Sequence, residues 1–194
     1  MQLKDAIETR KSVKRFHHKK PNWRKILRAL DAVRFAPTAG NKFVMRFMLV
    51  SDEKKITELA AASQQSFVGK AKYIVVAVSD DSSLVRSYGE RGVRYAAQQA
   101  GAAIQNFLLA LTEQKLVTSW VGHFYDDQVR TALSIPDGLH IEAMFPIGLD
   151  TKVGAASKTG SSSKLKTRLD QVLYFDKWGN DQMAGQIRLT HSAT

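Results

Sequence analysis

The stretch Y-A-A-Q-Q-A-G-A-A-I-Q-N-F-L-L-A-L-T, residues 95–112, has no charged side chain, although 24% of the residues in the chain are charged. Alanine and leucine favour helix and proline is absent, so the stretch predicts one buried helix that is apolar on nearly every face. Its length approaches a bilayer span, but amide side chains interrupt it and no second segment resembles it, so a membrane anchor is not expected. Packing alone favours a core helix. The small residues also suit a central helix shared between a dimer interface and a cofactor.

Helical and strand patterns alternate on both sides of this stretch. Helices are expected from Leu3 to Arg10, after Asn22 through Phe35, over 56–62 and over 126–133, and strands over 43–50, 73–78, 117–124 and 140–149. The run 73–78 is continuously apolar, which is typical of a strand covered on both faces. Residues 79–92 form a polar connection to the central helix. This order predicts an α+β or α/β sandwich in which helices flank a sheet.

The composition narrows the chemistry. A chain of 194 residues is long enough for one well-filled core, and no low-complexity linker divides it. Cysteine is absent, and none of the five histidines forms a ligand pair with an acidic residue on one predicted helix, so neither disulfides nor a metal site are expected. The N-terminal segment lacks the apolar core of a secretory signal, so the expected location is the cytoplasm.

Positive charge is concentrated near the N-terminus. The formal net charge is +11, and the first 28 residues hold ten basic side chains against two acidic ones. Nucleic acid, an acidic membrane and a phosphorylated cofactor all have the opposite sign. Such a run is also typical of a solvated face, so charge alone does not choose among these partners.

The familiar catalytic motifs are missing. The chain contains no G-x-S-x-G elbow, no G-x-G-x-x-G and no G-x-x-x-x-G-K-S/T, and its carboxylates are few and scattered. An enzyme with this sequence would therefore rely on a cofactor for its chemistry. Two basic clusters, R-K-S-V-K-R-F at 10–16 and K-L-K-T-R at 164–168, offer donors that suit a phosphate and could converge on one.

The order of these motifs resembles that of the flavin-dependent nitroreductase superfamily. Besides the first basic cluster, the matching motifs are A-P-T-A-G-N at 36–41, A-G-A-A-I-Q-N-F-L-L-A at 100–110, S-W-V-G at 119–122, F-P-I-G-L at 145–149 and K-x-R-L-D-Q-V-L-Y-F from 166. The resemblance implies an α+β three-layer sandwich with a central, mostly antiparallel sheet, in a single FMN-binding domain over residues 1–178. It also implies a homodimer formed through the long central helices, with FMN at the interface. The tail 179–194 is of a kind that often packs on a neighbouring subunit.

The resemblance also assigns roles to residues. The family's loop after the first helix holds the FMN phosphate and ribityl chain, and it maps to Arg10, Lys11 and Ser12. Lys14 matches the family's basic residue near the flavin N1 and O2 edge, where a positive charge stabilises the anionic reduced flavin. The other expected contacts are Pro37, Thr38, Ala39 and Asn41 from the other subunit, Val121 and Gly122 at a strand end facing N5, and Lys164, Lys166 or Arg168 at the phosphate.

The implied function is a transfer of two electrons from NAD(P)H to FMN at N5 and then to a small acceptor such as a nitroaromatic or a quinone. This is a ping-pong mechanism in which no protein side chain is catalytic. Departures from the family pattern bear on the substrate: Gln99 stands where an acid is common, residues 41–45 replace a Q-P-W continuation, and residues 115–117 replace a G-L-G turn. Trp120 is expected in the core or in the pocket wall.

Two alternatives stay open. The same fold hosts different flavin chemistry, namely flavin fragmentation and the dehalogenation of tyrosines. A basic nucleic-acid-binding protein is the alternative from another class, although the chain shows no helix-turn-helix, zinc or RNP signature and no aromatic residues interleaved with its basic run.

Overall fold

The computed structural model describes residues 1–151, 167–180, 182–183 and 187–188. The chain forms two compact units, Met1–Gly160 and Ser161–Thr194. The second unit contains the 3-10 helix η4 (Leu169–Gln171) and the antiparallel pair β5 (Gln182–Met183) and β6 (Ile187–Arg188). The domain boundary expected at residue 178 stays a prediction.

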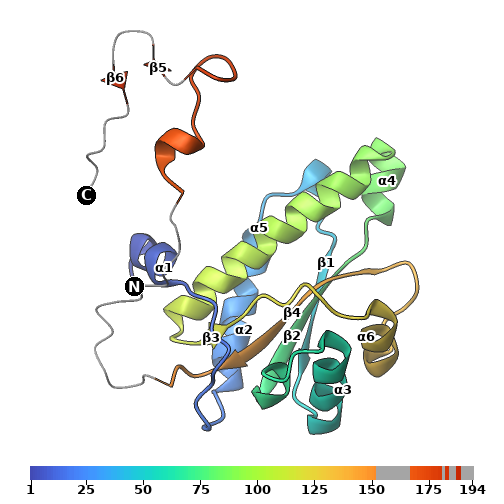
Figure 1. Ribbon diagram of the computed structural model, residues 1–194. Coiled ribbons are helices and arrows are strands. Elements are labelled where there is room, and N and C mark those ends of the chain that lie inside the picture. The colour runs from blue at the N-terminus through green and yellow to red at the C-terminus, as the bar shows by residue number, and fades with distance from the viewer. Residues whose placement is uncertain (152–166, 181, 184–186, 189–194) are drawn as a thin grey trace. The chain divides into compact units, whose positions relative to one another are not determined.

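The first unit is built on a four-stranded antiparallel sheet (Figure 1). Its strands are β1 (Met45–Val50), β2 (Tyr73–Ser79), β3 (Val117–Thr118) and β4 (His140–Gly148), in the spatial order β1-β2-β4-β3. All seven residues of β2 are buried, as the apolar run predicts. β2 is therefore covered on both faces.

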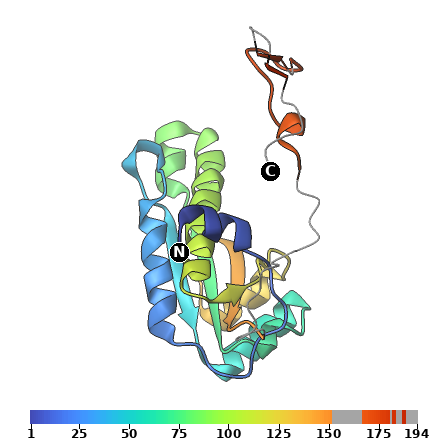
Figure 2. The same ribbon diagram turned by 90° about the vertical axis from the view of Figure 1, so that its left-hand side faces the viewer.

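Helices cover the two faces of this sheet (Figures 1 and 2). One face carries α2 (Trp23–Asp31), the 3-10 helix η1 (Ala32–Phe35) and α5 (Arg91–Glu113), and the other carries α3 (Glu53–Ser63), the 3-10 helix η3 (Val68–Lys70) and α6 (Asp126–Leu133). Two further helices, α1 (Leu3–Thr9) and α4 (Ser82–Tyr88), contact α5. The three-layer α+β sandwich is confirmed.

The sheet feeds two separate cores because side chains alternate across a strand. Val75 and Ala77 of β2 pack with α2 and α5, whereas Ile74 and Val76 pack with α3 and α6. Phe107 of α5 is fully buried in the first of these cores. This packing fixes the central helix along the sheet.

The central helix α5 is longer than predicted and is buried along one side only. Its buried side chains recur at helical spacing and include Ala96, Ala100, Ala103, Phe107 and Leu111. The opposite side is exposed at Ala97, Gln98, Gly101 and Gln105. The prediction of a helix buried on nearly every face is therefore wrong for the single chain, which leaves an uncharged stripe uncovered. Within the described residues, no helix combines the length and the apolarity needed to cross a membrane.

Two helical segments also differ from the sequence prediction. The helix expected through Phe35 ends at Asp31 and tightens into η1. Residues 79–92, expected as a polar connection, contain α4, because Leu84 is fully buried in a small core with Ala96. A single apolar anchor thus folds a segment that is polar by composition.

Gln99 joins α5 to the segment that follows the 3-10 helix η2 (Ala39–Asn41). Its side chain is buried: Oε1 accepts a hydrogen bond from Val44 N at 2.7 Å, and Nε2 donates to Lys42 O at 3.0 Å. A carboxylate could accept the first bond but could not donate the second. The amide at this position therefore holds residues 42–44 against the central helix.

Replacing Gln99 by methionine keeps the length of the side chain but removes both bonds. We expect the free energy of unfolding to fall by about 2 kcal/mol, because the buried N–H of Val44 and the partly buried carbonyl of Lys42 lose their partners. Urea unfolding followed by tryptophan fluorescence measures the change. Gln128→Met, at an exposed position of α6, is the control. An equal loss in both variants would show that the amide bonds are not the cause.

Candidate functional site

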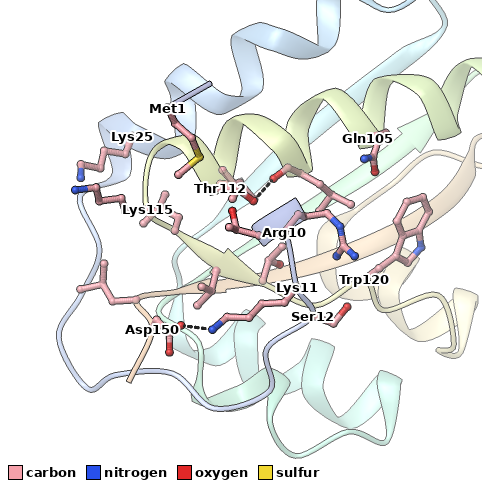
Figure 3. Close-up of a pocket in the computed structure, with 17 residues that line it drawn as sticks. Met1, Arg10, Lys11, Ser12, Lys25, Gln105, Thr112, Lys115, Trp120 and Asp150 are labelled. Atoms are coloured by element: carbon pink, nitrogen blue, oxygen red, sulfur yellow. Dashed lines mark hydrogen bonds and ion pairs between the residues drawn. The ribbon is translucent and has the colours of Figure 1, made fainter. Parts of the chain in front are cut away.

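A cavity of about 1050 Å³ lies in the first unit, beside the C-terminal half of α5 (Figure 3). Residues from six parts of the chain line it: the N-terminal residue, the end of α1 with the loop that follows, α2, α5, the segment 115–120 that contains β3, and the two residues after β4. The lining residues are Met1, Thr9, Arg10, Lys11, Ser12, Lys25, Gln105, Leu108, Leu111, Thr112, Lys115, Leu116, Val117, Thr118, Trp120, Leu149 and Asp150. The cavity thus combines an apolar floor from α5 with a basic rim.

The loop after α1 is fixed to the sheet by its backbone. Val13 N donates to Thr118 O at 2.8 Å, and His17 N donates to Leu149 O at 2.9 Å. Between these two bonds the ring of Phe16 lies on Gly148, where a Cβ atom would come within 2.6 Å of the ring. Only glycine leaves room for this contact. The loop is therefore held along β3 and β4, with residues 10–12 at the cavity.

Arg10, Lys11 and Ser12, the three residues predicted for the phosphate, all line this cavity. Figure 3 shows the guanidinium of Arg10 pointing into it. Lys11 Nζ lies 2.7 Å from Asp150 Oδ2, and both side chains are about one quarter exposed. In the described part of the chain, the charge of Lys11 is thus balanced by a carboxylate, whereas Arg10 forms no ion pair.

Two more basic side chains, which were not predicted from the sequence, line the cavity. Lys25 of α2 donates from Nζ to Gln114 O at 3.3 Å, at the C-terminal end of α5. Lys115 caps the same helix in the left-handed region, with φ at 59°, where glycine is usually favoured. The replacement of the family's G-L-G turn was the one signal in the sequence. Four basic side chains and one carboxylate give the rim a positive field suited to a phosphate.

Trp120 forms one wall of the cavity, which confirms the expectation of a pocket wall. Its ring packs edge to face on Phe145 with centroids 5.5 Å apart, and 45% of the residue is exposed. The strand predicted over 117–124 is limited to Val117–Thr118, because the backbone leaves the ladder and bridges β4 again only at Val121. Val121 is buried and Gly122 is exposed. Both follow the cavity wall directly without lining it.

Lys14 lies elsewhere. Its Nζ atom is 5.3 Å from the ring centroid of Phe67, and it is not among the residues that line the cavity. A cation attracted to a ring face in this way is held away from the rim. The single chain therefore does not bring Lys14 together with Arg10, and its proposed role at the flavin edge stays a prediction.

The segment expected from the other subunit lies at the other half of α5. Pro37, Thr38 and Ala39 line a smaller cavity of about 200 Å³ with Tyr95, Gln98 and Gln99. Asn41 closes η2 with a left-handed backbone, φ 55°. Residues 95–99 and 108–112 are separated by roughly 20 Å along a helix that rises about 1.5 Å per residue. One chain alone does not bring residues 37–41 to the basic cavity.

The C-terminal phosphate contact can be located only in part. Lys164 and Lys166 lie outside the described residues. Arg168 belongs to the second unit, is exposed, and precedes η4, where its backbone N–H donates to Gln171 Oε1 at 3.1 Å. Its predicted role at the phosphate stays a prediction.

The fold and the cavity together define the class: a three-layer α+β sandwich with a basic pocket beside its central helix. A model of the nitroreductase family matches residues 7–70 and 57–149, which is most of the chain. The chain belongs to the nitroreductase family, in which dependence on FMN is the norm.

Individual relatives agree with this assignment. A segment of 89 residues is 36% identical to a candidate nitroreductase of Methanocaldococcus jannaschii; the match covers 45% of this chain and 45% of that relative, less than half of its length. The crystal structure of a nitroreductase family protein from Clostridium novyi NT is 26% identical, with a TM-score of 0.72 over 93% of this chain and 96% of that one. An iodotyrosine deiodinase crystallised with FMN and 3-iodo-L-tyrosine shares the fold, at 21% identity and a TM-score of 0.68 over 78% of this chain and 91% of that one.

Proposed function

We propose that the protein is an FMN-dependent oxidoreductase that accepts two electrons from NAD(P)H and passes them to a small acceptor. The observation that carries this proposal is that Arg10, Ser12 and Trp120 line the same cavity. A guanidinium and a hydroxyl provide the charge-assisted and neutral hydrogen bonds that a phosphate monoester needs. The indole provides an apolar wall of the kind that a flat ring system packs against.

The residues of the cavity fit FMN. Arg10 and Ser12 would hold the phosphate, and the backbone of Val121 and Gly122 would approach the ring beside Trp120. Lys14, which packs on Phe67 and does not line the cavity in the single chain, would have to leave that ring to face the N1 and O2 edge. Lys164, Lys166 or Arg168 would add a phosphate contact. When bound, the flavin would supply the two-electron chemistry at N5, so no side chain of the cavity would need to act as acid, base or nucleophile.

The active form would be a homodimer. In one chain residues 37–41 lie at the opposite half of α5 from the basic cavity, so their proposed contact with FMN requires a second copy. The uncharged stripe at Ala97, Gly101 and Gln105 is the surface on which the copies would pack. Small residues there allow two helices to approach closely, and the exposed amides can pair across the interface.

Nitroaromatics and quinones are the proposed acceptors. Reductive dehalogenation of an aromatic ring is the second candidate, because the fold matches an iodotyrosine deiodinase crystallised with FMN and 3-iodo-L-tyrosine. The two activities differ in the product released. Chromatography of anaerobic reactions with a nitroaromatic and with 3-iodo-L-tyrosine therefore separates them.

A flavin titration tests the proposed function. Added FMN should lose fluorescence on binding, and sedimentation velocity should show a flavin-loaded species of dimer mass. NAD(P)H should then bleach the visible absorption of the bound flavin. Absence of FMN uptake at micromolar protein would contradict the proposal, and a flavin-loaded monomer would contradict the contribution of residues 37–41 in trans. Salt-sensitive nucleic-acid binding that FMN does not displace would favour the alternative from another class.

A further inference from the structure

A basic surface lies on the continuation of the loop that forms the cavity rim. We call this surface the outer patch; it consists of five exposed side chains, Arg15, Lys19, Lys20, Lys70 and Lys72. Two contacts bring their segments together. Lys20 Nζ lies 4.9 Å from the ring centroid of Tyr73, and Lys14 Nζ lies 5.3 Å from that of Phe67. The loop thus runs beside η3 and the start of β2 (Figure 1).

The backbone beneath the outer patch is fixed. The loop is bonded to β3 through Val13 and to the end of β4 through His17, and Phe16 between them packs on Gly148. Pro21, directly after Lys20, is buried. The charges therefore project from an ordered surface, so a docked partner would order little more than side chains.

The charge of the outer patch has no internal balance. Neither segment, 13–20 or 67–73, contains an acidic residue. Within the described residues none of the five patch members forms an ion pair, whereas Lys11 on the same loop pairs with Asp150. Unpaired like charges on neighbouring segments repel one another. An anionic surface that binds there relieves this repulsion, so its binding is favoured electrostatically.

The kind of partner follows from what accompanies the charge. Neither segment exposes a large apolar side chain, and the exposed aromatic ring in the two segments is that of His18, which packs on His17 with centroids 4.2 Å apart. A single-stranded nucleic acid would find no series of aromatic side chains on which its bases could stack, and a membrane would find no apolar anchor. A folded protein with a carboxylate-rich face needs neither, because small electrostatic interfaces are typical of transient redox encounters.

We infer that the outer patch docks an acidic electron-carrier protein of the one-electron type, a ferredoxin or a flavodoxin, next to the flavin cavity. Continuity of the loop carries the inference: residues 10–12 line the cavity and residues 15–20 bear the patch, so a docked carrier lies beside the proposed flavin. The inference rests on the proposed flavin site. Two reduced carriers would each lose one electron, and the oxidised flavin would gain both electrons with protons from solvent. These are the same two electrons that NAD(P)H gives as a hydride.

Binding of an oxidised, acidic two-iron ferredoxin tests the docking without any turnover. The test variant is Lys19→Glu with Lys20→Glu. The control, Arg86→Glu with Arg91→Glu, changes the net charge equally at the far end of the unit, around α4 and the start of α5. In low salt we expect the patch variant to bind about tenfold more weakly than the unchanged protein and the control within about twofold of it, with affinity falling as salt rises.

Three results would overturn the inference. The first is that neither ferredoxin nor flavodoxin binds the protein in low salt. The second is that both variants bind the carrier equally weakly. The third is that the patch variant loses binding of duplex DNA or anionic vesicles while its affinity for the carrier is unchanged. FMN uptake is titrated in parallel for every variant, so failure of the flavin site is recognised separately. In flavin-loaded protein, reduced ferredoxin should bleach the flavin more slowly in the patch variant than in the control variant or the unchanged protein. NAD(P)H should bleach the flavin of all three proteins at the same rate.

Discussion

Replacing Gly92 by alanine is expected to lower the free energy of unfolding by about 3 kcal/mol, the upper end of what overpacking usually costs. Gly92 lies in the first turn of α5, where a Cβ atom would overlap the backbone at Leu84 and Val85 of α4. Backbone cannot move aside as the end of a flexible side chain can. The overlap must therefore separate α4 from α5 and open the small core around Leu84.

Gly101 in the same helix is the matched control. A Cβ atom there meets nothing within 4 Å in the single chain. Gly101→Ala should therefore raise the free energy of unfolding of the single chain by about 0.5–1 kcal/mol through helix propensity. Because Gly101 also lies on the proposed dimer surface, sedimentation velocity of the variant separates this effect from a change in dimer assembly. Urea unfolding at one fixed protein concentration measures both variants. Equal effects of the two replacements would contradict the close approach of α4 and α5.

The second large effect is expected at Arg10. Arg10→Ala should weaken FMN binding by about 1.5–3 kcal/mol, the scale of a lost charge-assisted hydrogen bond, which is about 10- to 150-fold in Kd. The guanidinium lines the cavity and forms no ion pair in the described part of the chain, so its whole charge is available to a phosphate. Fluorescence titration with FMN measures the loss.

Lys19→Ala provides the control for Arg10, because Lys19 is a cation on the same loop that does not line the cavity. Its FMN affinity should stay unchanged. Riboflavin, which lacks the phosphate, should bind the Arg10 variant and the unchanged protein equally. A loss of riboflavin affinity in the variant would mean that Arg10 supports the cavity rather than the phosphate.

Much of the fold could be predicted from the sequence because it depends on local periodicity. The eight residues of α6 lie where their pattern places them, and the apolar run of β2 is buried on both faces. The exposed stripe on α5 could not be read in the same way. An uncharged side chain carries no mark of whether its own chain or a second copy covers it. The helix α4 was missed for the opposite reason, since one buried leucine outweighs its polar neighbours.

The residues of the candidate site likewise fall into those that the sequence predicts and those that only the fold brings together. Arg10, Lys11 and Ser12 are contiguous, so a motif could find them. Lys25, Lys115 and Asp150 reach the cavity from three distant parts of the chain, and only the topology of the sheet and helices brings them together. Lys14 shows the limit of a motif, because the ring of Phe67 holds its ammonium group at a place that the loop sequence does not encode.

The separation of residues 10–12 from residues 37–41 along α5 has a genetic consequence. In the proposed homodimer each flavin site takes its basic loop from one subunit and its Pro37–Asn41 segment from the other. A subunit defective only in the loop, paired with one defective only in the segment, concentrates both defects in one site and leaves the other intact. Two alleles that are each inactive alone would then complement one another in the same cell, whereas two alleles with defects in the same segment would not.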